Sequence, residues 1–152
     1  MAHDGQDTVT AAPVILDDLL TLTGAAVAPA AAVLDAAKDS IREMVVVDGR
    51  VSSRAVEAHQ SASHGLAWLA TYVEALRQMQ KWAEGLKEAG KFGEVEQLIH
   101  QIAFGEYLHQ IAGGIPMNQG EVVRLQEMGL GWDALSGFQC SEVQTLMARG
   151  NT

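Results

Sequence analysis

The stretch SASHGLAWLATYVEALRQMQKWAEGL, residues 61–86, contains no proline, and its large apolar side chains recur every three or four residues. That spacing matches the 3.6-residue turn of an α-helix and gathers the apolar side chains on one face. Ser52 or Ser53 can cap the segment at its start, and Gly90 ends it. We therefore predict one long helix over about 52–89, whose apolar face needs a partner element to bury it.

A second long helix is predicted over about 94–112, in the segment that contains LIHQIAFGEYLHQIAGG at residues 98–114. The glycine pair at the end of this stretch is a strong stop signal for a helix. We expect the two long helices to form the centre of an antiparallel bundle. The candidate core residues of the second helix are Val95, Leu98, Ile99, Ile102, Leu108 and Ile111.

This second helix repeats a short pattern, and the two copies lie nine residues apart. Nine residues make roughly two and a half turns of an α-helix. His100 and His109 therefore point to opposite sides, as do Ile102 and Ile111, so one pocket cannot hold both histidines. A helix with apolar residues on two faces lies at the centre of its domain or is covered by a partner.

The rest of the chain predicts shorter flanking helices. Apolar spacing and stop signals place them at Val14–Gly24, Pro29–Val46, Glu121–Met128 and Ser141–Arg149. An Asp48-Gly49 turn could form a hairpin, but an isolated hairpin is only marginally stable. The predicted fold class is all-α: an antiparallel helical bundle with one long helix packed on a second, plus shorter flanking helices. Residues 1–13 are predicted to be a disordered tail, and residues 14–152 a single helical domain.

The charge balance excludes several classes of partner. The 152 residues include 19 acidic and 10 basic ones, so the formal net charge is −9. Nucleic acids and anionic membranes attract basic proteins, so we expect neither as a partner. The most apolar run, GAAVAPAAAVLDAA at residues 24–37, is too short and too weakly hydrophobic to cross a bilayer. A single cysteine, Cys140, and the absence of a secretory signal predict a cytoplasmic protein.

Glu106 and His109 are the candidate metal ligands, because the spacing E-x-x-H puts a carboxylate and an imidazole on one face of a helix. Di-metal carboxylate bundles use two such pairs and two further glutamates. This sequence has no second pair, so we expect no bound metal ion. G-x-S-x-G, C-x-x-C and P-loop motifs are missing as well, so we assign no catalytic and no cofactor-binding residue.

Trp68 and Tyr72 lie four residues apart, on one face of the first long helix. Large aromatic rings at helical spacing are typical of a core or an interface. With Ile102 and Ile111 of the second helix, they are the candidate interface and packing residues.

Two stretches, HGLAWLATYVEALRQMQKW at 64–82 and IAFGEYLHQIAGGIPMNQGEVVRLQEMGL at 102–130, resemble the N-terminal helical extension of the (2S)-methylsuccinyl-CoA dehydrogenases. This family is a branch of the acyl-CoA dehydrogenase superfamily. The resemblance spans roughly Gly65 to Leu130. It implies a parent enzyme that oxidises methylsuccinyl-CoA to mesaconyl-CoA with FAD and passes electrons to an electron-transfer flavoprotein.

In that family the flavin site, the acyl-CoA cleft and the catalytic glutamate belong to a dehydrogenase body that follows the extension, and nothing in this chain matches them. We therefore expect an accessory, non-catalytic helical domain without a cofactor of its own, which packs against the dehydrogenase body or an oligomer partner. The ending MARGNT indicates a piece of a longer flavoenzyme or a stand-alone homologue of the extension. Two alternatives stay open: a small metal-binding bundle that uses Glu106 and His109, and a free-standing dimerising helical module.

Overall fold

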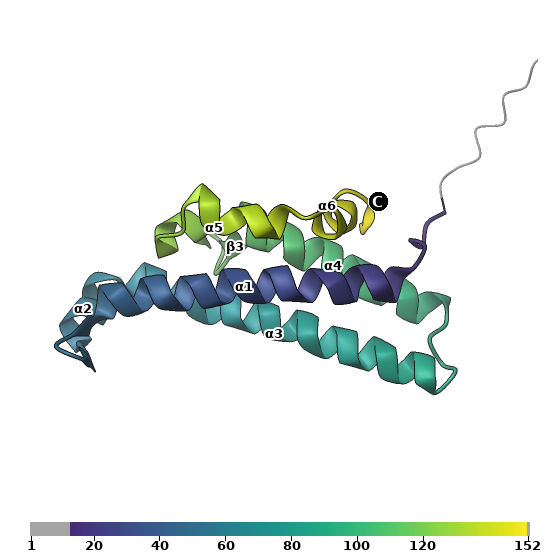
Figure 1. The fold of residues 1–152 in the computed structure, drawn as a ribbon, viewed down its shortest axis with the longest axis horizontal. Coiled ribbons are helices and arrows are strands. Elements are labelled where there is room, and N and C mark those ends of the chain that lie inside the picture. The colour runs from purple at the N-terminus through teal and green to yellow at the C-terminus, as the bar shows by residue number, and fades with distance from the viewer. Residues whose placement is uncertain (1–12, 152) are drawn as a thin grey trace, which may run out of the picture.

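The computed structural model of this protein describes residues 13–151. Over this range the chain forms six α-helices, two 3-10 helices and two short antiparallel hairpins (Figure 1). In chain order the elements are α1 (Leu19–Val45), β1 (Val46–Val47), β2 (Arg50–Val51), α2 (Ser53–Ala58), α3 (Gln60–Glu88), α4 (Glu94–Gly113), β3 (Ile115–Pro116), β4 (Val122–Val123), η1 (Leu125–Met128), α5 (Trp132–Ser136), η2 (Gly137–Gln139) and α6 (Ser141–Arg149). The predicted all-α class is confirmed. The tail predicted over 1–13 lies, except for its last residue, outside the described residues.

The first helix, α1, is a continuous helix of 27 residues that shares the centre of the bundle with α3 and α4. It packs along α3 and also contacts α4 and α6. Figure 1 shows α3 on one side of α1 and the α5–α6 region on the other. The sequence predicts two helices here, with a break between Gly24 and Pro29. That prediction is wrong, because α1 runs through both residues.

Gly24 and Pro29 stay inside α1 because of their surroundings. A Cβ atom at Gly24 would lie 3.2 Å from Nε2 of Gln80, so the glycine leaves room for this α3 side chain beside the α1 backbone. A proline at position 29 cannot donate a hydrogen bond to the carbonyl of Ala25, four residues earlier. Ala25 is exposed, so water can replace the missing donor.

By length and composition alone, α1 could cross a membrane: the mean hydropathy of its most apolar stretch is 1.6. The sequence prediction excludes a membrane span only for residues 24–37. The continuous helix α1 is longer than that run. A core helix of a folded domain meets the same two criteria. The buried face of α1, which includes Ala26, Val33 and Ala37, packs on other helices of the bundle. We therefore describe α1 as a core helix.

The helix predicted over 52–89 is divided at a single residue, His59, whose φ of −116° and ψ of 34° are not helical. α2 ends before it and α3 begins after it. His59 is neither glycine nor proline, so nothing in the sequence marks the break. The predicted cap at the start is confirmed, because the Ser52 side chain accepts a hydrogen bond from the Ala55 N–H at 3.3 Å.

The first hairpin, β1 with β2, forms at the turn that the sequence marks. Asp48 and Gly49 have φ angles of 50° and 75°, the left-handed geometry that a type I′ turn requires. The sequence prediction treats this hairpin as isolated, and the structure shows that it is not. β1 continues from α1, β2 leads into α2, and the Ser52 N–H donates to the Val45 carbonyl at 2.8 Å. The two helices therefore hold both ends of the hairpin.

The second hairpin, β3 with β4, takes the place of the first turn of a predicted helix. The sequence predicts a helix over Glu121–Met128, whereas only the 3-10 helix η1 forms there. Gly114, with a φ of 137°, turns the chain at the end of α4, and a Cβ there would lie 2.5 Å from Cγ1 of Val122. The predicted stop at Gly129 is confirmed, because this residue follows η1 in a left-handed conformation.

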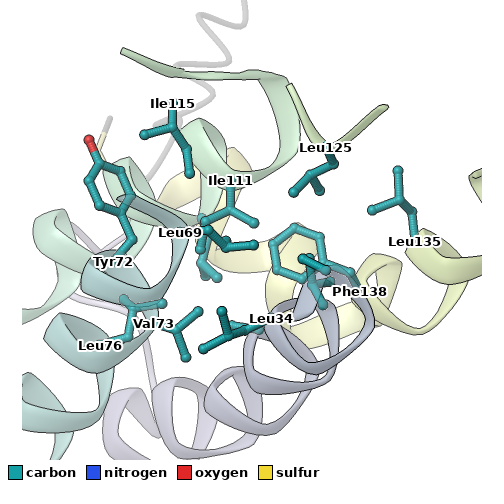
Figure 2. Close-up of a cluster of buried hydrophobic side chains, with 14 of the residues drawn as sticks. Leu34, Leu69, Tyr72, Val73, Leu76, Ile111, Ile115, Leu125, Leu135 and Phe138 are labelled. Atoms are coloured by element: carbon teal, nitrogen blue, oxygen red, sulfur yellow. The ribbon is translucent and has the colours of Figure 1, made fainter. Parts of the chain in front are cut away.

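The core forms where α1, α3 and α4 meet the C-terminal elements. Figure 2 shows Leu69 of α3 next to Ile111 of α4, and Val73 of α3 next to Leu34 of α1. Phe138 of η2 closes the cluster from the other side. α3 and α4 pack against each other, which confirms the predicted pair of long helices.

Two glycines of α3 provide a test of this packing. A Cβ at Gly65 would lie 2.5 Å from Cγ2 of Val123, whereas nothing lies within 4 Å of one at Gly85. We predict that Gly85→Ala stabilises the protein by up to about 1 kcal/mol, because alanine favours the helix. Gly65→Ala should destabilise it by about 1 kcal/mol or more, because the stiff valine cannot yield. Urea unfolding measures both, and effects of the same sign would contradict the close contact.

Candidate interaction surface

Three apolar side chains of α4 face solvent on one side of the helix. Val95, Ile99 and Ile102 are 63%, 51% and 41% exposed. Their spacing of four and then three residues places them on adjacent turns of one face. We call these three residues the α4 stripe. Ile111, on the other side, is 1% exposed, so α4 has two apolar faces as predicted, and the described chain leaves one of them uncovered.

The sequence predicts the three stripe residues as core, and this prediction is wrong because they are exposed. In their place two polar side chains, His100 and Gln101, are buried, with exposed fractions of 0% and 2%. A polar group is buried at little cost only where hydrogen-bonding partners meet it. Those partners come from distant parts of the sequence, so apolar periodicity could not reveal them.

His100 belongs to a buried chain of hydrogen bonds that joins α4, α1 and α3. Its Nε2 atom lies 2.9 Å from Oγ1 of Thr23, which donates to Oε1 of Gln80 at 2.7 Å. The Gln80 amide donates in turn to the Leu20 carbonyl and the Glu84 carboxylate. The Thr23 hydroxyl has one hydrogen and also lies 2.9 Å from the Leu19 carbonyl, so a ring hydrogen on Nε2 of His100 is the arrangement that fits this contact best. Nδ1 of the ring has no hydrogen-bond partner among the described residues.

Burial lowers the pKa of the His100 imidazole from 6.5 to about 4, and the Glu84 carboxylate opposes part of this effect. An unfolded chain protonates this ring below about pH 6.5. The folded protein takes up that proton only near pH 4, so acid favours the unfolded chain between these two values.

We predict that the stability contributed by neutral His100 is complete above pH 6.5 and is lost as the pH falls toward 4. At about 1.4 kcal/mol per pKa unit, the loss approaches about 3 kcal/mol. In His100→Gln the amide can still donate to Thr23 but does not titrate, so this part of the pH dependence should disappear. Urea unfolding between pH 4 and 7 measures it. Identical pH profiles for the two proteins would argue against a buried neutral ring.

Gln101 ties both ends of the described chain to α4. Its Oε1 accepts a hydrogen bond from the Leu16 N–H at 2.7 Å, and its Nε2 donates to the carbonyls of Val14 at 2.9 Å and Gly150 at 3.4 Å. A Cβ at Gly105 would lie 3.2 Å from the Gly150 backbone, so α6 ends in close contact with α4. The segment before α1 and the end of α6 therefore meet at one place on α4.

We predict that Gln101→Leu destabilises the protein by about 1–3 kcal/mol, because it leaves backbone groups at Val14 and Leu16 without their partner. Amide hydrogen exchange at Leu16 should become faster. Gln78→Leu, at an exposed position on α3, is the control and should change stability by less than about 0.5 kcal/mol. Unchanged exchange at Leu16 would show that Gln101 does not hold this segment.

The two candidate metal ligands are engaged separately. The Glu106 carboxylate accepts a hydrogen bond from the Asn151 amide, and Nδ1 of His109 lies 3.2 Å from the Gly105 carbonyl. Within residues 13–151, no group of three or more His, Cys, Asp or Glu side chains is arranged to hold a metal ion. The described geometry therefore gives the metal-binding alternative no support.

Trp68 and Tyr72 belong to a row of rings along the boundary between α3 and α4. Tyr72 stacks on Tyr107 with ring centroids 4.7 Å apart, and Trp68 meets Tyr72 edge-on at 6.4 Å. The Tyr72 hydroxyl donates to Oε1 of Gln110 at 2.6 Å, and burial followed by the neighbouring Tyr107 raises its pKa. Tyr72 is buried and Trp68 half-buried. The row therefore joins two helices of this chain, and its part in an interface stays a prediction.

A cavity of about 660 Å³ lies between the start of α1 and the connection from α3 to α4. Its charged lining residues are Asp17, Asp18 and Lys87. The pyrophosphate of FAD needs cations or free N–H donors; Lys87 is the one cation in this lining, and the two carboxylates beside it repel phosphate. We derive no flavin chemistry from this lining.

A smaller pocket of about 280 Å³ lies between the end of α4 and the elements α5, η2 and α6. Leu135, Phe138 and Met147 form much of its wall, together with Trp132, which is 74% exposed. Its volume is below the range typical of sites for drug-sized ligands. The sequence did not point to it, because its walls come from an irregular segment without periodicity.

The protein-family models do not match the chain. Among curated proteins, it is 50% identical over 138 residues to the (2S)-methylsuccinyl-CoA dehydrogenase of Cereibacter sphaeroides. The chain is similar to part of an acyl-CoA dehydrogenase. The resemblance predicted from the sequence is thereby confirmed.

The matched region includes 91% of this chain but only 24% of the relative. The chain therefore spans about a quarter of the length of the curated relative it matches. The activity, substrate and partners of the whole relative belong to a protein about four times as long.

Proposed function

We propose that this chain is an accessory, non-catalytic helical domain of an acyl-CoA dehydrogenase-type flavoprotein, and that it packs against the dehydrogenase body through the α4 stripe. The observation that carries this proposal is the stripe itself. Its three apolar side chains are exposed side by side on a helix whose other face is buried in the core. Contiguous exposed apolar groups are typical of interaction sites. About three quarters of the relative lies outside the matched region and can supply the covering surface.

The end of the described chain also lies beside the stripe. Gly150 packs closely on Gly105, and Asn151 donates a hydrogen bond to Glu106, one turn beyond Ile102. In the order that the family resemblance implies, the dehydrogenase body follows this helical domain along the chain. A covalent connection between the two raises the effective concentration of the body at the stripe.

For the whole flavoprotein we propose the oxidation of methylsuccinyl-CoA to mesaconyl-CoA with FAD as cofactor, an electron-transfer flavoprotein as acceptor, and the cytoplasm as location. The name of the relative and its 50% identity to this chain support the substrate. The family resemblance supports the cofactor and the electron acceptor, and the single cysteine supports the location. We assign no residue of this chain to the reaction.

The test makes one substitution in two settings. Ile99→Glu is introduced into the isolated chain and into a full-length chimera, in which this chain replaces the matching segment of the Cereibacter sphaeroides enzyme. Val47→Glu in the first hairpin, at a side chain of similar exposure, is the matched control. We predict a change below about 0.5 kcal/mol for Ile99→Glu in the isolated chain, because the site is exposed there. In the chimera it should cost about 2 kcal/mol or more, because docking buries the charge.

Urea and thermal unfolding measure the stability of each variant in the isolated chain and in the chimera. The unmutated chimera should retain its flavin and activity. The proposal fails if Ile99→Glu and Val47→Glu behave alike in the chimera. It also fails if Ile99→Glu is as harmful in the isolated chain as in the chimera. Should the chimera not assemble, the same substitution at the matching position of the relative itself gives the answer.

A further inference from the structure

Three carboxylates lie beside the α4 stripe along the helix. Glu94 and Glu96 lie on either side of the first stripe residue in the sequence, and Glu106 lies one turn beyond the last. Glu94 is exposed, and the other two are partly exposed. α4 contains no lysine or arginine, and its inner histidine, His100, is buried with a lowered pKa. Its other histidine, His109, is exposed seven residues beyond Ile102, two turns along the same side of the helix. The three carboxylates outnumber this one imidazole, so the charged groups that α4 brings to a contact are mainly negative.

We infer that the surface that covers the α4 stripe is an apolar helix face bordered by lysine and arginine, and that it is not a second copy of this chain. The inference rests on the proposed docking function and names the chemistry of its partner. The spacing of Val95, Ile99 and Ile102, four residues and then three, is that of the seam between two packed helices. A helix from the dehydrogenase body can therefore lie along the stripe.

The carboxylates beside the stripe determine which kind of surface can cover it. A covering surface partly desolvates the neighbouring carboxylates, which is costly unless opposite charges meet them. Lysine and arginine beside the apolar contact supply those charges. Two copies of this chain paired through α4 would instead bring two sets of carboxylates together, with no lysine or arginine from either helix. Like charges at a contact disfavour that pairing.

The test reverses the charges at the stripe. Glu94→Lys combined with Glu106→Lys is compared with Glu43→Lys combined with Glu57→Lys, two exposed glutamates of α1 and α2. Each pair is made in the chimera and in the isolated chain, so that effects on α4 itself can be subtracted. We expect a lower unfolding midpoint for the stripe pair in the chimera at low salt. Most of this drop should vanish near 1 M salt, where the Debye length is about 3 Å.

The outcomes separate the two proposals. If Ile99→Glu destabilises the chimera but the charge reversal does not, docking stands and the basic partner is wrong. If neither change affects the chimera, docking itself is wrong. Sedimentation of the isolated chain tests whether a second copy of this chain covers the stripe. We expect a monomer at micromolar concentration. A dimer that Ile99→Glu abolishes would overturn the inference and make a second copy the partner.

Discussion

The rotation of α4 about its own axis is fixed by hydrogen bonds from two buried polar side chains. His100 reaches Thr23 of α1, and Gln101 holds the backbone at Val14 and Leu16. With both turned inward, the α4 stripe on the other side of the helix must face outward. A rotation that buried the stripe would leave these polar groups without partners, at about 1–3 kcal/mol for each. The exposed apolar face therefore follows from what the opposite face of α4 buries, which is these polar groups together with Phe104, Leu108 and Ile111.

The same contacts explain why α1 is one continuous helix at the centre of the fold. Gln80 of α3 accepts the Thr23 hydroxyl hydrogen and donates to the Leu20 carbonyl, one turn earlier in α1. Gly24 leaves room for that amide beside the helix. One glutamine thus bridges α1 and α3, and Thr23 also contacts His100 of α4. Thr23, Gln80 and His100 link all three long helices, and α6 completes the arrangement where Gly150 meets Gly105.

The features that depend on local chemistry could be predicted from the sequence. Ser52 caps its helix, Asp48 and Gly49 form a turn, and Gly129 ends η1, because each works through its own backbone geometry. The opposite placement of Ile102 and Ile111 follows from helical geometry in the same way. The break predicted near Gly24 was wrong because a side chain 56 residues away occupies the space that this glycine leaves. Likewise, the stripe residues looked like core because the partners of His100 and Gln101 come from distant segments.

Solvent access to the stripe, with and without a dehydrogenase body, tests the central claim most directly. The labelling rate of an Ile99→Cys thiol, in a Cys140→Ser background, is measured at that residue by mass spectrometry in the isolated chain and in the full-length chimera. Val47→Cys serves as the reference for general access. The account predicts at least a tenfold slower reaction at position 99 in the chimera, with position 47 unchanged. Equal rates at position 99 in the two settings would show that the stripe stays open, and the docking role would then be wrong.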